Sequence, residues 1–245
     1  MLLSLKELVG YKVNGKDGFI GKVEQFYFDY MNWIIRYLLV NTSDWLPGRH
    51  VLISPASFSG HPAWHSKIFN VDLIKQIVKG APAIDIYKPV SHEKELELIK
   101  YHDWPVYWEV NMQDFIPPII MPTEEEDSIS EKELVDSHLQ GTNKVIGFHI
   151  HALDGEIGHV EDFIVEDNKW AIRYMVVNTK NWVPENKVLV APQWAQRISW
   201  EKSKIYMNHS KEEIKKSPEY DPSAPVNREY EEVLHDYYGR PKYWD

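Results

Sequence analysis

Cysteine is absent from this 245-residue chain. Its absence excludes disulfide bonds and thiolate metal sites and permits a reducing compartment. The chain also lacks an apolar run long enough to cross a bilayer, and Lys6 and Glu7 interrupt the apolar start before it reaches the length of a signal segment. We therefore expect a cytoplasmic protein without a secretion signal or a membrane-spanning segment.

Negative charge exceeds positive charge, with 37 aspartates and glutamates against 27 lysines and arginines, and no basic stripe occurs. The net charge is −10, and the segment from Glu109 to Ser137 holds nine acidic residues against one lysine, so the rest of the chain is close to neutral. Proteins that bind nucleic acid draw most of their affinity from lysine and arginine side chains that neutralise phosphates. The charge pattern therefore argues against a nucleic acid as a partner.

Common catalytic and nucleotide-binding signatures are missing as well. The sequence contains no G-x-S-x-G, Walker loop, dinucleotide fingerprint or H-E-x-x-H. It does contain 43% hydrophobic and 13% aromatic residues, which is enough to bury one or two cores. The sequence thus predicts a folded protein that is not an enzyme and needs no cofactor.

One sequence pattern occurs twice in the chain. Residues 10–55 align with residues 147–192 without a gap, and 147 minus 10 gives an offset of 137. The later part of each copy aligns at 136, which is 225 minus 89. Such a match indicates an internal duplication of domain-sized units. We expect domains at 1–108 and 138–245, joined by an acidic, proline-containing linker at 109–137.

Short runs of β-forming residues separated by turn signals predict a small barrel or sandwich in the first unit, and the repeat extends this prediction to the second unit. In the first unit, residues 2–9 are interpreted as a lead-in without a strand. The expected strands lie at 11–13, 21–29, 33–42, 51–54 and 68–71. The strand at 21–29 breaks its alternation near Gln25, which indicates a bulge, and the strand at 33–42 is apolar on both faces and is expected at the centre of the sheet.

Helix signals follow the strands of each unit. The expected N-caps are Asp72, Ser91, Ser210 in a capping box with Glu213, and Asn227. Longer helices are expected at 93–101 and 229–238, and Gly239 is expected to end the second one. The predicted fold class is therefore mainly β with helical additions (α+β), with two tandem barrels, each followed by short helices and an aromatic tail.

The repeated motifs resemble those of the PRC-barrel family, named for the cytoplasmic domain of the photosynthetic reaction centre H subunit and shared with the C-terminal domain of a ribosome maturation factor. The motifs are Gly-x-x-Val, Asp-Gly-x-Ile-Gly-x-Val-Glu-Asp-Phe, Ile-Arg-Tyr-x-Val-Val and Val-Leu-Val-x-Pro. The segment from Tyr237 to Trp244 resembles the ending of stand-alone bacterial members of the tandem type.

The resemblance covers both units and implies a non-catalytic binding or scaffolding module. Such a module docks through its barrels on a protein, or on a peripheral membrane-associated complex. The chain departs from the reaction centre subunit in lacking its membrane helix, and from the ribosome factor in carrying a second barrel in place of a different domain. The resemblance therefore implies an unknown protein partner and does not identify the process.

Arg36 and Arg173 lie inside the otherwise apolar central strands. They are candidates to bind an anion or a partner. The alternative, which we favour, is that each arginine pairs with a carboxylate or stacks on an aromatic ring at the barrel rim, because a charge in an apolar strand needs a partner.

The other candidate interaction residues are aromatic: Trp45, Trp182, Tyr107, Trp108, Tyr243 and Trp244. The two Tyr-Trp pairs stay in phase at the end of each unit, which indicates that a folded surface holds them. We expect each tail to dock on the opposite barrel and to hold the barrels in a pseudo-twofold pair. Docking of each tail on its own barrel is the alternative.

One group of residues has metal-binding character, namely His149, His151, Asp154 and His159. Histidines two apart on a strand point to the same face and can share an ion. The alternative function is therefore a metal- or small-ligand-dependent binder, or an enzyme, with a site at the cleft between the barrels.

The linker contains the apolar segment 115–122, which is either a docking peptide for a partner or, as we favour, a staple across one barrel.

Overall fold

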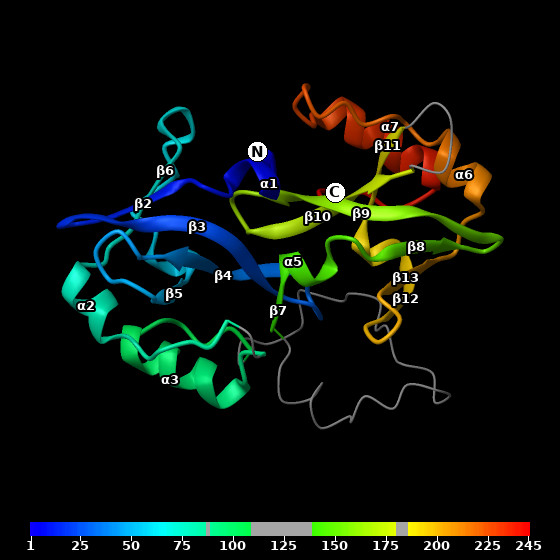
Figure 1. Cartoon of the computed structure of the whole chain (residues 1–245). Coiled ribbons are helices and arrows are strands. Elements are labelled where there is room, and N and C mark those ends of the chain that lie inside the picture. The colour runs from blue at the N-terminus through cyan, green and yellow to red at the C-terminus, as the bar shows by residue number, and fades with distance from the viewer. Residues whose placement is uncertain (87–88, 109–138, 180–185) are drawn as a thin grey trace. The chain divides into compact units, whose positions relative to one another are not determined.

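The computed structural model describes residues 1–86, 89–108, 139–179 and 186–245 (Figure 1). These residues divide into two compact units. The described part of the N-terminal unit comprises residues 7–108 and 139–143, and that of the C-terminal unit comprises residues 1–6 and 144–245, less the gaps above. Each unit is mainly β with short helices, as the sequence predicts. None of the described helices is long and apolar enough to cross a membrane.

The N-terminal unit is built on one mixed sheet. Its strands are β2 (Lys12–Gly15), β3 (Gly18–Asp29), β4 (Ile34–Asn41), β5 (His50–Ile53) and β6 (Ile68–Asn70). They lie in the order β5–β4–β3–β2–β6, and the β2–β6 pair is parallel while the other pairs in this path are antiparallel. The pairing of β3 with β4 shifts between Val23 and Gln25, so the predicted bulge is confirmed.

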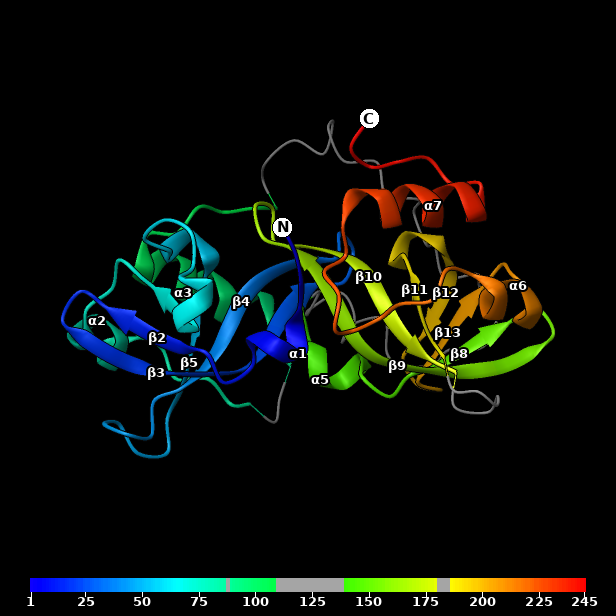
Figure 2. The ribbon, with the colours of Figure 1, turned by 90° about the horizontal axis from the view of Figure 1, so that it is seen from above.

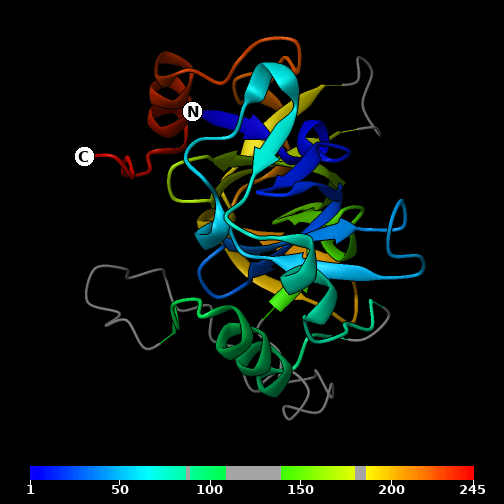
Figure 3. The ribbon, with the colours of Figure 1, turned by 90° about the vertical axis from the view of Figure 1, so that its left-hand side faces the viewer.

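Strand β4 lies between β3 and β5, and its consecutive residues from Tyr37 to Val40 are all buried. Both of its faces are therefore covered, as its apolar sequence predicts. The turn before it is held by Asp29, whose Oδ1 accepts the backbone N–H of Met31 at 2.9 Å. Trp33 then adopts a left-handed backbone with φ of 57°, and its ring stacks on Phe28 at 5.0 Å between centroids. Helices α2 (Lys75–Gly80) and α3 (His92–His102) lie on one side of this sheet (Figures 1 and 3).

The C-terminal unit repeats this series of strands and adds one more, β12. Its strands are β8 (His149–Ala152), β9 (Gly155–Glu166), β10 (Ala171–Asn178), β11 (Lys187–Val190), β12 (Ala195–Ser199) and β13 (Lys204–Met207). Its helices are α6 (Lys211–Lys216), α7 (Arg228–Tyr238) and α5 (Thr142–Val145), and α5 is shared with the other unit. The order is β11–β10–β9–β8–β13–β12, with β8 and β13 parallel. Helix α7 runs beside β10 and β11 (Figure 2).

Equivalent elements keep the offsets of the sequence repeat. Strand β9 begins 137 residues after β3, which is 155 minus 18, and helix α7 begins 136 residues after α3, which is 228 minus 92. In both units the described strands form an open path between two end strands. The mainly β class is thus confirmed, whereas two closed barrels are not confirmed by the described pairings.

The first strand of each repeat belongs to the sheet of the other repeat. Strand β1 (Leu2–Ser4) pairs with β9, and β7 (Leu139–Gly141) pairs with β3. A short helix follows each strand, α1 (Leu5–Leu8) after β1 and α5 after β7. The prediction of a strandless lead-in at residues 2–9 is therefore wrong. The compact units also differ from the boundaries 1–108 and 138–245 by this exchange.

Most of the predicted helix ends are observed. The Ser91 side chain accepts the N–H of Lys94, Ser210 and Glu213 form the capping box, Asn227 accepts the N–H of Tyr230, and Gly239 ends α7 with φ of 60°.

The predicted cap at Asp72 is wrong. Helix α2 begins at Lys75, and the carboxylate that accepts the Lys75 N–H, at 3.0 Å, belongs to Asp17 in the preceding hairpin. Asp72 instead forms an exposed ion pair with Lys16 at 3.3 Å.

Candidate functional site

A buried glutamate joins the last helix of the N-terminal unit to its sheet and its tail. The hydroxyls of Tyr37 and Tyr107 both donate to Oε1 of Glu95, at 2.8 and 2.6 Å. The guanidinium of Arg36 stacks on the Tyr107 ring, with Cζ 3.7 Å from the centroid. We call Arg36, Tyr37, Glu95 and Tyr107 the N-terminal tail clamp.

The sequence places each member of this clamp by local rules. The cap at Ser91 starts α3, and Glu95 then shares the inward face of the helix with Leu98 and Ile99, three and four residues later. Strand β4 supplies Arg36 and Tyr37, and Arg36 also pairs with Asp29 at 3.3 Å. A glutamate with no exposed surface is tolerated at this position because two hydroxyls donate to it.

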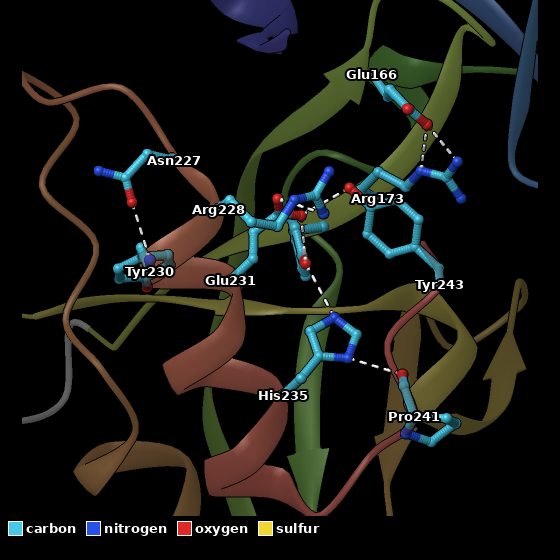
Figure 4. Close-up of polar contacts among 10 residues, drawn as sticks. Glu166, Arg173, Asn227, Arg228, Tyr230, Glu231, His235, Pro241 and Tyr243 are labelled. Atoms are coloured by element: carbon cyan, nitrogen blue, oxygen red, sulfur yellow. Dashed lines mark hydrogen bonds and ion pairs between the residues drawn. The ribbon is translucent and has the colours of Figure 1, made fainter. Parts of the chain in front are cut away.

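The C-terminal unit contains the equivalent clamp (Figure 4). Glu231 accepts the hydroxyls of Tyr174 and Tyr243 on Oε1, at 2.9 and 2.7 Å. Arg173 lies over the Tyr243 ring at 3.9 Å and donates from Nε to Glu166 at 2.8 Å. We call Arg173, Tyr174, Glu231 and Tyr243 the C-terminal tail clamp.

Two further polar residues surround the C-terminal tail clamp. Arg228 reaches Oε2 of Glu231 at 3.0 Å and stacks on Trp244 at 3.9 Å. His235 lies 3.0 Å from the Tyr174 hydroxyl through Nε2, and its Nδ1–H donates to the carbonyl of Pro241 at 2.8 Å (Figure 4). The N-terminal unit has His92 and Ile99 at these two positions, since 228 minus 92 and 235 minus 99 both give 136.

The two environments produce different electrostatics. Burial raises the pKa of Glu95 from 4.5 to about 7, although the Tyr107 and Tyr37 hydroxyls and the Arg36 charge oppose the rise. Burial and the nearby Glu95 carboxylate raise the pKa of both Tyr37 and Tyr107. Burial lowers the pKa of His235. Near neutral pH these tyrosines therefore act as hydrogen-bond donors and His235 is neutral.

In each clamp both tyrosine hydroxyls, one carboxylate oxygen and the arginine are engaged within the unit. The tyrosine hydroxyls, the carboxylates and the arginines bind one another. This chemistry suits a structural latch that fastens the tail and the last helix to the sheet. Each arginine makes both of the contacts that the sequence analysis weighed against anion binding, the ion pair and the aromatic stack.

The expected crossed docking of the tails is wrong. Tyr107 contacts Glu95 and Arg36 of its own unit, and Trp108 contacts His92 at 4.5 Å between ring centroids. Tyr243 and Trp244 likewise contact residues of the C-terminal unit. The physical reason is that each tail ends beside its own final helix, where a buried carboxylate requires a hydroxyl donor.

The histidine group predicted from the sequence does not assemble into a metal site. His149 pairs with Glu156 at 2.7 Å, and the His151 ring lies 5.1 Å from the Tyr206 ring. Asp154 accepts the N–H of Lys211 at the start of α6, at 2.7 Å. His159 is paired opposite His149 in the β8–β9 ladder. Within the described ranges, no group of three or more histidine, aspartate or glutamate side chains is arranged to hold a metal ion.

The remaining sequence candidates have separate outcomes. Trp45 is part of the N-terminal unit, where its Nε1 donates to the carbonyl of Ile20 and Lys75 lies over its ring at 5.5 Å. Trp182 and the apolar segment 115–122 lie outside the described residues. Sequence reasoning missed Glu95 and Glu231, although they occupy equivalent positions of the repeat, since 231 minus 95 gives its offset of 136.

An apolar patch is exposed where α2 meets α3 in the N-terminal unit. Ile74, Ile77 and Tyr101 are 37, 38 and 41% exposed, and the Tyr101 hydroxyl donates to the carbonyl of Ile77 at 3.0 Å. We call these three residues the α2–α3 patch. The equivalent positions in the C-terminal unit are Ser210, Glu213 and Tyr237. Only the tyrosine is common to both units, so the aliphatic part of the patch is specific to the N-terminal unit.

The chain matches no protein-family model, and no curated protein matches it as a relative.

Proposed function

We propose that this protein is a non-catalytic binding or scaffolding module that docks on a protein partner through the α2–α3 patch. The exposed aliphatic side chains of that patch carry the proposal. Exposed isoleucines beside an exposed tyrosine are typical of surfaces that bind proteins. A catalytic site would instead gather free acids, bases or nucleophiles, and the polar groups of the tail clamps are engaged with one another.

The contrast between the units supports the choice of this patch. Both units place a tyrosine of the last helix against a backbone carbonyl of the preceding helix, Tyr101 against Ile77 and Tyr237 against Glu213. The shared tyrosine is therefore part of the scaffold. The isoleucines replace the polar residues Ser210 and Glu213 of a capping box, and they serve no comparable capping role. Binding a partner explains their exposure.

Site-specific photo-crosslinking in the full chain tests this function. A benzophenone amino acid replaces Tyr101 in one version and Tyr237 in the matched control, because the two tyrosines are equally exposed and lose the same kind of hydrogen bond. We expect a discrete covalent adduct with a protein from position 101, lost on adding Ile74→Glu, and none from position 237. Equal adducts from both positions, or none from position 101, would contradict the proposal.

The family resemblance adds a finer proposal. If the two units are PRC-type barrels, docking on a protein of a peripheral membrane-associated complex in the cytoplasm, with the barrels in a pseudo-twofold pair, follows from the family. The repeated motifs support this proposal, and it rests on the sequence. An experimental structure with the partner bound would test the closure of the barrels and their pairing together.

A metal- or small-ligand-dependent function at His149, His151, Asp154 and His159 was the second candidate. No contact among the described residues favours it, because these side chains engage separate neighbours.

A further inference from the structure

The exchanged first strands occupy the same register on their respective acceptor strands. Strand β1 places Leu2 opposite Glu166 and Ser4 opposite Ile164, and β7 places Leu139 opposite Asp29 and Gly141 opposite Tyr27. Because 139 minus 2 and 166 minus 29 both equal 137, each acceptor edge holds its strand at equivalent positions. Backbone pairing alone therefore does not distinguish β1 from β7, whereas the side chains at the two edges differ.

The edge of β9 recognises β1 through a buried carboxylate. Asp162 is 7% exposed, and its Oδ2 accepts the hydroxyl of Ser4 at 2.5 Å. Its Oδ1 accepts the backbone N–H of Lys6 at 3.0 Å and that of Phe163 at 2.7 Å. The intervening residue, Leu5, is 3% exposed. The β9 edge therefore fits a serine followed by an apolar side chain.

The edge of β3 recognises β7 in a different way. Gln25 stands at the position of Asp162, since 162 minus 25 gives 137. It faces Gly141, where an added Cβ would lie 2.8 Å from Oε1 of Gln25, so a larger residue requires the glutamine to shift. The next residue, Thr142, accepts the backbone N–H of Phe26 on its hydroxyl at 3.3 Å. This edge therefore fits a glycine followed by a threonine.

Exchanging the two strands would break contacts on both edges. Strand β1 on the β3 edge would press Ser4 against Gln25 and bring Leu5 in place of the Thr142 hydroxyl. Strand β7 on the β9 edge would remove the Ser4 hydroxyl from a buried carboxylate and put a threonine in the buried place of Leu5. The Gln25 side chain can shift at its end, so the main loss is the hydrogen bond that the buried Asp162 accepts from Ser4, and this loss favours the observed pairing.

We propose that residues 4–5 and 141–142 are an address, that is, the residues that determine which sheet each first strand joins, and that they direct each strand to the sheet of the other repeat. By the same proposal, the β9 edge at residues 162–166 is a docking site for residues 2–6 of a second copy of this chain. The occupant is defined by what the edge already holds, because a second copy carries the same serine and leucine in the same order. The result is a strand-swapped dimer.

Strand β1 has three residues, and all three are only partly buried. Its contacts at the β9 edge are the ladder with β9, the Ser4 and Lys6 bonds to Asp162, and the ion pair between the Met1 amine and Asp167. The boundary between the two compact units falls immediately after Lys6, where the chain passes from one unit to the other. Opening at that point frees the strand and leaves Asp162 without the Ser4 hydroxyl, and a strand from a second chain restores the same contacts.

Mixing two versions of the chain tests the docking site. The acceptor chain lacks residues 1–6 and therefore has an empty β9 edge, and the donor chain is full length and carries Asp162→Ala, which weakens its own edge. We expect native mass spectrometry to detect a heterodimer, and no homodimer of either chain alone, at high micromolar concentration. The matched control is a donor that also carries Ser4→Gly and Leu5→Thr, the residues of β7, and we expect it to form about tenfold less heterodimer.

The absence of a heterodimer, or equal amounts with both donors, would overturn the proposal. If the acceptor chain does not fold alone, refolding it with a peptide of residues 1–6 that keeps its free N-terminal amine, the partner of Asp167, provides the second measurement. We expect this peptide to restore the circular dichroism of the folded protein, and a peptide with the Gly-Thr address to fail. If neither peptide restores folding, or if both do, the β9 edge is not a site that reads this address.

Discussion

The two tail clamps share an arginine, two tyrosines and a glutamate, but they differ in what surrounds the carboxylate. In the C-terminal tail clamp, Arg228 forms an ion pair with Glu231. In the N-terminal tail clamp the equivalent residue is His92, whose ring lies against Trp108 instead. The comparison shows that both units bury a glutamate beside two hydroxyl donors, and that in the C-terminal tail clamp an arginine of the same helix is also an ionic partner of the carboxylate.

The units also differ in which segment supplies the tryptophan that packs near the strand tyrosine of the clamp, Tyr37 or Tyr174. Trp194 packs near Tyr174 at 6.4 Å, whereas Trp104, from the tail, packs on Tyr37 at 5.8 Å. The residue equivalent to Trp194 is Ser57, since 194 minus 57 gives 137, and its hydroxyl accepts the Trp104 Nε1–H at 2.6 Å. The N-terminal unit thus takes this indole from the segment after α3, which therefore contributes a core residue that its C-terminal equivalent does not.

The largest expected effect comes from this difference. Trp104 is 8% exposed and belongs to a buried cluster with Tyr37, Leu52 and Leu98. We expect Trp104→Ala to destabilise the N-terminal unit by about 3–5 kcal/mol, because it removes a buried indole and leaves a cavity. Hydrogen exchange of peptides from β4 and β10, read by mass spectrometry, reports each unit separately, and protection of β10 is expected to change less.

A second variant places a tryptophan in the N-terminal unit at the position that it has in the C-terminal unit. Adding Ser57→Trp to the Trp104→Ala chain supplies an indole from the position that holds Trp194 in the other unit. We expect it to recover at least about 1 kcal/mol of the lost stability, since burying an aromatic side chain is favourable. An added loss of stability would show that the two units do not share this packing site.

The second expected effect is a pH dependence specific to the N-terminal unit. The folded pKa of Glu95, about 7, lies above its usual 4.5, so the unfolded chain ionises first as the pH rises. The stabilisation is therefore complete below pH 4.5, falls between pH 4.5 and 7, and stays constant above pH 7. The fall is on the order of 3 kcal/mol. Urea unfolding from pH 4.5 to 8 should show it in the native chain, and a Glu95→Gln chain should lack it.

The third expected effect concerns the ionic partner. Glu231→Gln removes the charge that faces Arg228 while keeping an oxygen acceptor, and we expect a loss of about 2 kcal/mol at pH 6. Glu95→Gln at the same pH replaces a largely neutral carboxyl and is expected to cost less than about 1 kcal/mol. Equal losses from the two variants would mean that Arg228 does not distinguish the clamps.

The sequence could predict those parts of the fold that depend on neighbouring residues. The caps at Ser91 and Asn227, the bulge near Gln25 and the need of the two arginines for a carboxylate or aromatic partner all follow from short-range patterns. Strand β1 could not be predicted, because a strand of three residues shows no periodicity and its partner, β9, lies more than 150 residues away. The sequence also could not show which unit each tail contacts, since that depends on the direction in which a buried carboxylate faces.

Glu95 and Glu231 are an intermediate case. Each lies three residues before a buried leucine on its helix and is in phase between the repeats, and that combination was a usable signal for an inward-facing acid. The two acids were overlooked because charged residues on a short helix are usually exposed to solvent.

The smallest expected effect tests whether the tail tunes the carboxyl that holds it. The Tyr107 hydroxyl donates to Oε1 of Glu95 at 2.6 Å, and this bond opposes the rise in the pKa of Glu95 caused by burial. Tyr107→Phe removes the donor but keeps the ring beneath Arg36, so we expect a loss of only about 1 kcal/mol. Without the donor the pKa of Glu95 should rise further, and the pH above which stability becomes constant should move above 7. Tyr243→Phe removes the equivalent bond of the C-terminal tail clamp and controls for the size of the loss. Urea unfolding at closely spaced pH values separates the two quantities: a loss of stability with an unmoved pH profile would mean that the tail is held by Glu95 without tuning its protonation.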